Sequence, residues 1–201
     1  SVNALAQSGS VTTNGDFVTG LVTRGFGTNM NVAGTINLGG DNAAGASIVD
    51  TGDNTGQVQN VQSILNIAST GRIITTGNST FGAVISYRNG GGGGGAVGSL
   101  IFDGDIDTSG NAGHGLGIIY DLGSNARTQI EVSGTIDTSG VGSNGVEIVY
   151  ADLTMGGMPS AASMDPGTDL NISVDGAVAV TGADSSGINV YLEDGRSTEI
   201  N

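Results

Sequence analysis

Apolar and polar residues alternate along this chain in a short sequence motif that recurs six times. The clearest copy runs from Gly134 through Ile136 and Thr138 to Gly140, and Gly145 follows five residues later. Every copy has glycines at these three places and an aliphatic residue two positions after the first glycine. The first glycines are Gly9, Gly34, Gly71, Gly104, Gly134 and Gly176. Agreement in three glycine columns and one aliphatic column indicates an internal repeat.

When each copy is numbered from its first glycine as position 0, apolar residues recur at positions −4, −2, +2, +12 and +14. Polar residues lie between them, which is the two-residue period of β-strands. The pattern predicts three short strands per copy, at positions −4 to −1, +1 to +5 and +12 to +16. Nothing recurs at helical spacing. Position −4 reads Leu5, Met30, Ile67, Leu100, Ile130 and Ile172, and position −2 reads Gln7, Val32, Ser69, Phe102, Val132 and Val174.

The spacing between successive copies varies from 25 to 42 residues, whereas the length of the motif itself is constant. The variation falls in one connection per copy, as expected for loops that project from one edge of a stack. We therefore predict an all-β fold, a right-handed parallel β-helix of about six coils with three short strands each. Residues 1–201 form a single β-helix repeat domain in this interpretation. Residues 198–201 repeat the start of the strand at Thr128, which favours a piece of a longer rod, or a rod that stacks on another copy.

Stacked coils place equivalent residues above one another at about 4.8 Å. This predicts a tyrosine ladder and a threonine ladder, and the threonine hydroxyls are expected to hydrogen-bond along the stack. The ladders are Tyr87, Tyr120 and Tyr150 at position +16, and Thr75, Thr108 and Thr138 at position +4. The repeated glycines are expected at tight corners that require a positive φ or no side chain.

Composition narrows the function classes. The net charge is −14, and the basic residues are five arginines without a lysine. This deficit argues against binding to nucleic acid, which needs a basic face, and against binding to anionic membranes. The chain has no cysteine, so disulfides and thiolate metal sites are excluded. No apolar run reaches the length of a membrane-spanning helix, so we expect no membrane insertion by this segment.

Residues that carry chemistry are few. The single histidine, His114, lies between two glycines, and stacking predicts neither a nucleophile nor a carboxylate beside it. The acidic cluster Asp103, Asp105, Asp107 and Asp137 is the best candidate for a metal site, because Ca²⁺ would relieve repulsion between neighbouring carboxylates. Simple solvation is the interpretation we favour. We assign no catalytic, cofactor-binding or metal residues and no cofactor, with Ca²⁺ as the open alternative.

Two long connections have unusual compositions. Residues 89–95 are an asparagine followed by six glycines, which is typical of a flexible loop. Residues 154–167 hold three of the four methionines and both prolines. This stretch is either a partner-contact loop with adaptable methionines or, as we favour, a loop that folds its methionines back over the rod.

The motif at residues 104–110, with Gly115 after it, resembles the passenger repeats of large bacterial autotransporter adhesins. It is also similar to haemagglutinin-type surface proteins of Gram-negative bacteria. The resemblance implies export across the outer membrane and a place outside the cell, either secreted or associated with the outer membrane. It further implies use as an adhesin or autoaggregation stalk, and it supplies no catalytic residues.

We therefore expect a non-enzymatic extracellular β-helix that acts in adhesion or autoaggregation as a stiff stalk. Its expected partners are other copies of the chain and host or matrix surface glycans and proteins, and not nucleic acid. One alternative is a self-assembling structural protein that forms extracellular filaments or a surface lattice by coil-on-coil stacking. Another is a carbohydrate-active enzyme, which the scatter of the arginines outside any one repeat column disfavours.

Overall fold

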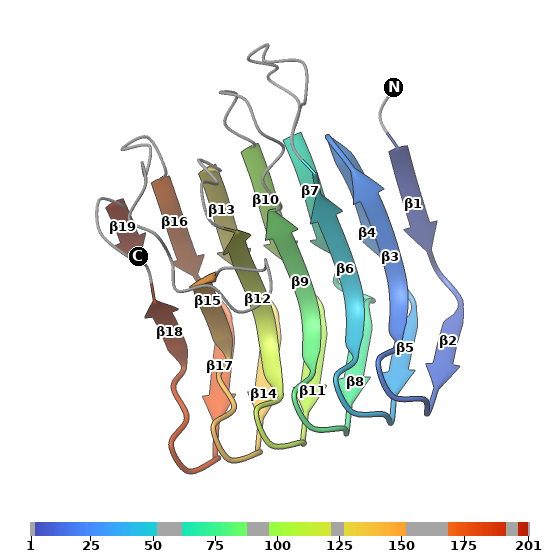
Figure 1. Ribbon diagram of the computed structural model, residues 1–201, viewed down its shortest axis with the longest axis vertical. Coiled ribbons are helices and arrows are strands. Elements are labelled where there is room, and N and C mark those ends of the chain that lie inside the picture. Colours follow the sequence, from blue (N-terminus) through green and yellow to red (C-terminus); the bar gives the residue numbers. More distant parts are fainter. Residues whose placement is uncertain are drawn as a thin grey trace.

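A computed structural model of the chain shows three parallel β-sheets along which the chain winds in successive coils (Figure 1). The structure describes residues 3–51, 62–87, 97–121, 127–151, 169–191 and 197–200. Each strand pairs in parallel with the strand three places further along the chain. The described residues thus form a parallel β-helix of about six coils, and they contain no helix. This confirms the predicted fold class.

Each coil adds one strand to each sheet, in the order A, B, C. Sheet A contains β1 (Asn3–Gln7), β4 (Thr28–Val32), β7 (Gln62–Ile67), β10 (Val97–Phe102), β13 (Arg127–Val132), β16 (Asp169–Val174) and β19 (Ser197–Ile200). Sheet B contains β2 (Ser10–Thr13), β5 (Thr35–Leu38), β8 (Arg72–Thr75), β11 (Asp105–Thr108), β14 (Thr135–Thr138) and β17 (Ala177–Val180). Sheet C contains β3 (Thr19–Gly25), β6 (Ala44–Asp50), β9 (Phe81–Tyr87), β12 (His114–Asp121), β15 (Val146–Ala151) and β18 (Ile188–Tyr191).

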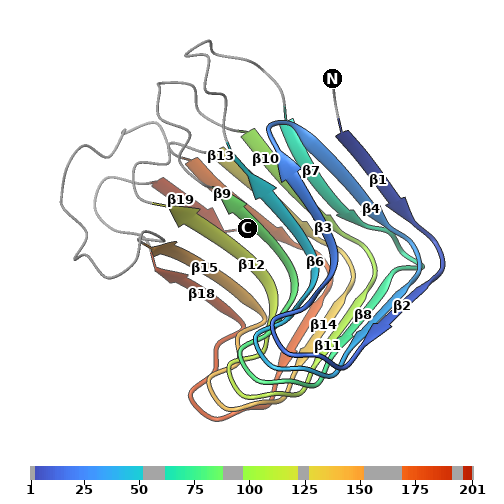
Figure 2. The same ribbon diagram turned by 45° about the vertical axis from the view of Figure 1, so that its right-hand side comes forward.

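The predicted register is confirmed in sheets B and C. At position +2, Ile106 pairs with Ile73 on one side and with Ile136 on the other. Strands of sheet C run close to the predicted +12 to +16 span. Strands of sheet A begin two or three residues earlier than predicted, except β7, which begins five residues earlier. Sheets B and C meet at tight connections that are stacked along one edge of the molecule (Figure 2). We call this edge the B–C corner.

The predicted register is wrong in sheet A for the third copy. Leu65, not Ile67, lies between Met30 and Leu100 in the position −4 column. Ile67 lies in the position −2 column, between Val32 and Phe102, where the repeat numbering had placed Ser69. This copy has two extra residues before its glycine, and they form a turn in which the Gly71 N–H donates to the carbonyl of Ala68 at 2.7 Å. The apolar alternation is thus preserved and the glycine spacing is not.

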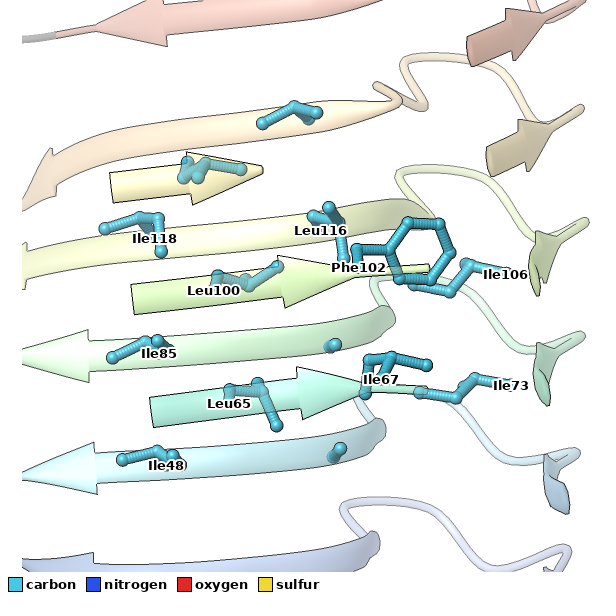
Figure 3. Close-up of a cluster of buried hydrophobic side chains, with 14 of the residues drawn as sticks. Ile48, Leu65, Ile67, Ile73, Ile85, Leu100, Phe102, Ile106, Leu116 and Ile118 are labelled. Atoms are coloured by element: carbon cyan, nitrogen blue, oxygen red, sulfur yellow. The ribbon is translucent and has the colours of Figure 1, made fainter. Parts of the chain in front are cut away.

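One continuous hydrophobic core fills the space between the sheets. The aliphatic columns point inward from all three sheets, so that each side chain packs against its own coil and the neighbouring ones (Figure 3). Leu65, Leu100, Ile106, Ile118 and Ile136 are all at most 1% exposed. Aliphatic burial of this kind is the main contribution to the stability of the stack.

The glycine columns are explained by close approach between coils rather than by positive φ. The glycines with positive φ in the described residues are Gly25, Gly27 and Gly142, and none of them belongs to the three columns. A Cβ on Gly134 would meet the carbonyl oxygen of Gly104 in the coil below at less than 3.0 Å. Of the two reasons expected for these glycines, the absence of a side chain is therefore the one that applies.

The threonine ladder is present, but its hydroxyls do not hydrogen-bond along the stack. Thr75, Thr108 and Thr138 are fully buried. The Thr75 hydroxyl lies 3.0 Å from the hydroxyl of Thr80 in its own coil. The Thr108 hydroxyl donates to the carbonyl of Gly113 at 2.9 Å, also in its own coil. The hydroxyls of Thr75 and Thr108 therefore bond within their own coils at the B–C corner, and the buried Thr138 hydroxyl has no hydrogen-bond partner among the described residues. The expectation of hydrogen bonds between coils is wrong.

The remaining predictions concern the connections and the last coil. The glycine stretch 89–95 and the methionine-rich stretch 154–167 lie outside the described residues. Strand β19 pairs with β16 as the repeated sequence predicts, with Thr198 beside Leu170 in the column of Thr128. In the part of the chain that the structure describes, no helix is long and apolar enough to cross a membrane.

Candidate functional site

The acidic cluster lies on and beside the outer face of sheet B. Asp105 and Asp107 are exposed on β11, and Asp103 is exposed in the turn before it. Asp107 pairs with Asp137 of the next coil, as the sequence predicts, whereas Asp105 pairs with Thr135. Nowhere in the described ranges do three acidic or histidine side chains gather closely enough to hold a metal ion. The cluster thus brings two carboxylates together rather than four.

The His114 side chain lies on the outer face of sheet C, next to the B–C corner. It stands beside Phe81 in register, and the two rings are 5.0 Å apart with an angle of 35° between their planes. Its Nδ1 accepts a hydrogen bond from the backbone N–H of Asn144 at 3.1 Å. Nδ1 is therefore unprotonated, and the neutral ring carries its proton on Nε2.

A carboxylate does lie near the histidine, contrary to the expectation from the sequence. The charge of Glu147 acts on His114 and favours its protonated form. Asn144 connects the two residues, because its backbone N–H donates to His114 and its side-chain N–H donates to Glu147 Oε2 at 2.5 Å. Asn189, one coil further on, donates to the same oxygen at 2.9 Å. The glutamate lies on β15 and Asn144 just before it, and the hydrogen bond between their side chains places both at the start of sheet C.

Asn144 fixes this group of residues across three coils. Its backbone N–H is bound to His114 of the previous coil, and its side-chain oxygen accepts the N–H of Ser186 in the next coil at 2.7 Å. The residue is 8% exposed. We call Phe81, His114, Asn144, Glu147 and Asn189 together the corner cluster. Its polar groups are held by neighbouring coils and not by a mobile loop.

Burial determines the protonation of the histidine. It lowers the pKa of the His114 imidazole below the ordinary value of 6.5, and the nearby charge of Glu147 opposes this with a smaller effect. In the described residues, the imidazole has no hydrogen bond to a hydroxyl that would act as a nucleophile. Among the described residues, His114 is therefore not arranged as a base paired with a nucleophile.

A second group of polar residues lies inside the coil, at the far end of sheet C from the corner. Asp50 is 1% exposed and accepts a hydrogen bond from the Ser63 hydroxyl at 2.6 Å. The Ser63 oxygen in turn accepts the backbone N–H of Thr28 at 3.1 Å. Further along the stack, the hydroxyl of Tyr120 on β12 donates to the hydroxyl of Thr128 on β13 at 2.7 Å. These pairs link sheet C to sheet A across the interior.

The tyrosine ladder begins in this interior layer. Tyr120 pairs with Tyr87 and Tyr150 in register, as the sequence predicts, and the rings of Tyr87 and Tyr120 stack at 5.4 Å. The Tyr87 hydroxyl reaches over Gly98 of sheet A, where a Cβ would overlap it. Burial raises the pKa of the Tyr87 phenol well above its ordinary value, and the charges of Tyr120 and Asp50 add to this. The phenol is therefore neutral and serves packing.

A ladder of side-chain oxygens runs along the B–C corner, and it was not predicted. One oxygen of Asp16 accepts the backbone N–H of Asp41, one coil further on, at 3.0 Å. The Asp41 oxygen accepts the N–H of Asn78 at 2.7 Å, and Asn78 accepts that of Asn111 at 3.0 Å. The ladder ends where Asn111 accepts the N–H of Val141 at 3.1 Å. Aspartate or asparagine seven positions after four of the repeat glycines is the sequence signal that could have revealed it.

Comparisons of the chain with protein-family models, with curated proteins and with solved structures found no match.

Proposed function

We propose that this chain is a non-enzymatic β-helix of a bacterial surface protein, which acts outside the cell as a stiff stalk in adhesion or autoaggregation. The observation that carries the proposal is the continuity of the stack. Three sheets of six or seven strands run side by side in one register, and one core is shared by all coils. Such a stack resists bending because every coil is hydrogen-bonded to its neighbours along three sheets.

The topology also separates the scaffold from the variable segments. Every connection from a sheet C strand to the next sheet A strand leaves and enters at the edge where these two sheets meet. These connections vary in length from residues 26–27 to residues 152–168. A rigid support with variable segments at one edge is typical of proteins that present contact surfaces.

The test is attachment by the isolated chain. Beads coated with the purified protein are expected to cluster with one another, or to attach to host cells or matrix, more than albumin-coated beads do. The matched control is Gly134→Arg, which places a large side chain against the carbonyl of Gly104 and breaks the stack. Equal behaviour of folded protein and albumin would contradict the proposal, as would cleavage of a polysaccharide by the pure chain.

The second candidate is a structural protein that assembles coil on coil into filaments or a lattice. Among the described strands, β2 and β17 end sheet B and β3 and β18 end sheet C, each with one edge that has no neighbour in the chain. Unpaired edges of this kind template further strands. Negative-stain electron microscopy with and without Ca²⁺ separates the candidates. Long uniform fibres favour assembly, and short rods of one length favour the stalk.

A further inference from the structure

The corner cluster combines an aromatic ring with fixed polar groups on the outer face of sheet C. The Phe81 ring lies over Gly117 of the neighbouring strand, where a Cβ would come within 2.5 Å of the ring atoms Cδ1 and Cε1. Gly117 thus allows the ring to rest against the sheet, and His114 packs beside it at 5.0 Å. The Phe81 side chain is only half-buried, so part of the ring is open to solvent. A ring fixed in this way offers an apolar platform without loss of side-chain entropy on binding.

Two polar atoms beside the ring remain available for a ligand. Glu147 uses Oε2 for the amide groups of Asn144 and Asn189. In the described part of the chain, neither its Oε1 nor the Nε2 of His114 has a hydrogen-bond partner. A neutral histidine donates through Nε2, whereas a carboxylate oxygen only accepts. Glu147 pairs in register with Gly117, over which the Phe81 ring lies, so the cluster presents one donor and one acceptor next to an aromatic ring.

The charge of the cluster restricts the ligand. Glu147 is its acidic group, the cluster contains no arginine, and the whole chain has a net charge of −14. An anionic ligand would be repelled, because no cation at the cluster compensates its charge. A ligand that fits has an apolar face for the ring and hydroxyl groups, which both donate and accept hydrogen bonds. A neutral pyranose has these properties, since its axial C–H bonds form an apolar face and its hydroxyls lie around the rim.

We propose that the corner cluster is a subsite for a neutral pyranose of a glycan chain. One sugar face rests on Phe81, the His114 Nε2–H donates to a sugar oxygen, and Glu147 Oε1 accepts from a sugar hydroxyl. Asn144 and Asn189 are positioning residues, because they hold the carboxylate. This inference rests on the adhesive function proposed above, for which it names the class of partner.

The single histidine of the chain makes the test specific, because its ring gives one set of NMR signals. The full chain is titrated, at a pH where the imidazole is neutral, with the neutral tetrasaccharides cellotetraose, chitotetraose and maltotetraose. We expect a saturable shift of the His114 ring signals with at least one of them at about 10 mM or less. Tetragalacturonate, which is anionic, is expected to bind at least about ten-fold more weakly. Absence of a saturable shift with all three neutral sugars would overturn the proposal, as would equal binding of tetragalacturonate.

Two variants and one control locate the binding. Phe81→Leu keeps apolar cover over Gly117 but removes the aromatic face, and Glu147→Gln replaces the free acceptor by a donor. Each is expected to weaken binding about ten-fold. Phe17→Leu changes an aromatic side chain that is 81% exposed elsewhere, and it is expected to bind as the unmodified chain does. Circular dichroism establishes that each variant is folded, and unchanged binding by folded Phe81→Leu would refute the assignment.

The same variants separate this proposal from the proposed function. If beads coated with the unmodified chain attach and beads coated with Phe81→Leu attach equally well, the adhesive function stands and the subsite is wrong. If beads coated with the unmodified chain do not attach, the adhesive function fails whatever the titration gives. Reduced attachment by Phe81→Leu but not by Phe17→Leu supports both.

Discussion

At the level of single residues, every coil has a left-handed backbone position eight residues after its first glycine. The side chains there differ, which hides the position in the sequence. The residues are Phe17, Asn42, Ser79, Ala112, Gly142 and Asp184, with φ between 49° and 67°. Glycine, asparagine and aspartate tolerate this conformation, whereas alanine and phenylalanine are strained in it. The corner is therefore imposed by the stack and not by the local sequence.

Relief of this strain gives the first prediction. Ala112→Gly is expected to raise the free energy of unfolding by about 0.5–1 kcal/mol, because the strain of a left-handed alanine exceeds the entropy that glycine adds to the unfolded chain. Ala177→Gly is the control, since Ala177 is exposed in β17 without positive φ. It is expected to lower stability by about 0.5–1 kcal/mol. Urea denaturation measures both, and two losses of equal size would contradict the prediction.

The histidine gives the second prediction. Burial lowers the pKa of His114 below 6.5, so the folded state prefers the neutral ring more than the unfolded state does. The resulting stability is fully present above the unfolded value of about 6.5 and is lost as the pH falls through it toward the folded-state pKa. NMR titration of the ring is expected to give a midpoint below 6.5. Glu147→Gln should lower the midpoint further, because the charge of Glu147 raises it. A midpoint above 6.5 would contradict the prediction.

At the level of elements, contact between coils explains why the repeated motif contains glycine. A matched pair of variants tests this explanation. A Cβ on Gly134 would overlap the backbone around Gly104, whereas a Cβ on Gly9 of the first coil meets nothing within 4 Å. Gly134→Ala is expected to lower the free energy of unfolding by about 1–3 kcal/mol through overpacking. Gly9→Ala should leave it unchanged or raise it by up to about 1 kcal/mol. Thermal denaturation distinguishes the two, and equal effects would show that the glycines are kept for backbone conformation.

The elements also show what the sequence could and could not reveal. The strands, their order and the core columns follow from the two-residue alternation, because only one face of each strand is buried. The register of Leu65 could not be read from the glycine spacing, since a turn absorbs the two extra residues before Gly71. The corner cluster was missed because its members lie in four different coils and at two repeat positions. Asn144 and Glu147 are distant from His114 in sequence, and only the stacking brings them together.

At the level of the whole molecule, charge opposes the association that the proposed function requires. Some acidic residues lie in register on adjacent coils, such as Asp107 and Asp137, and the net charge of −14 applies to the complete chain. Two such rods repel each other at low ionic strength, where the screening length is about 30 Å, and much less at 0.1 M, where it is about 10 Å. Self-association must therefore rely on apolar contacts or strand edges, and salt should favour it.

Sedimentation velocity tests this expectation. The fraction of associated protein is expected to rise as NaCl increases from about 10 mM to about 300 mM, because screening weakens the repulsion between rods. CaCl₂ at matched ionic strength shows whether cations bridge acidic faces, since bridging adds association beyond screening. Asp107→Asn then tests whether such bridging uses the paired carboxylates of β11 and β14, with Asp16→Asn at the B–C corner as the control. A fall in association with rising salt would contradict the prediction, because it would mean that charge attraction holds the rods together.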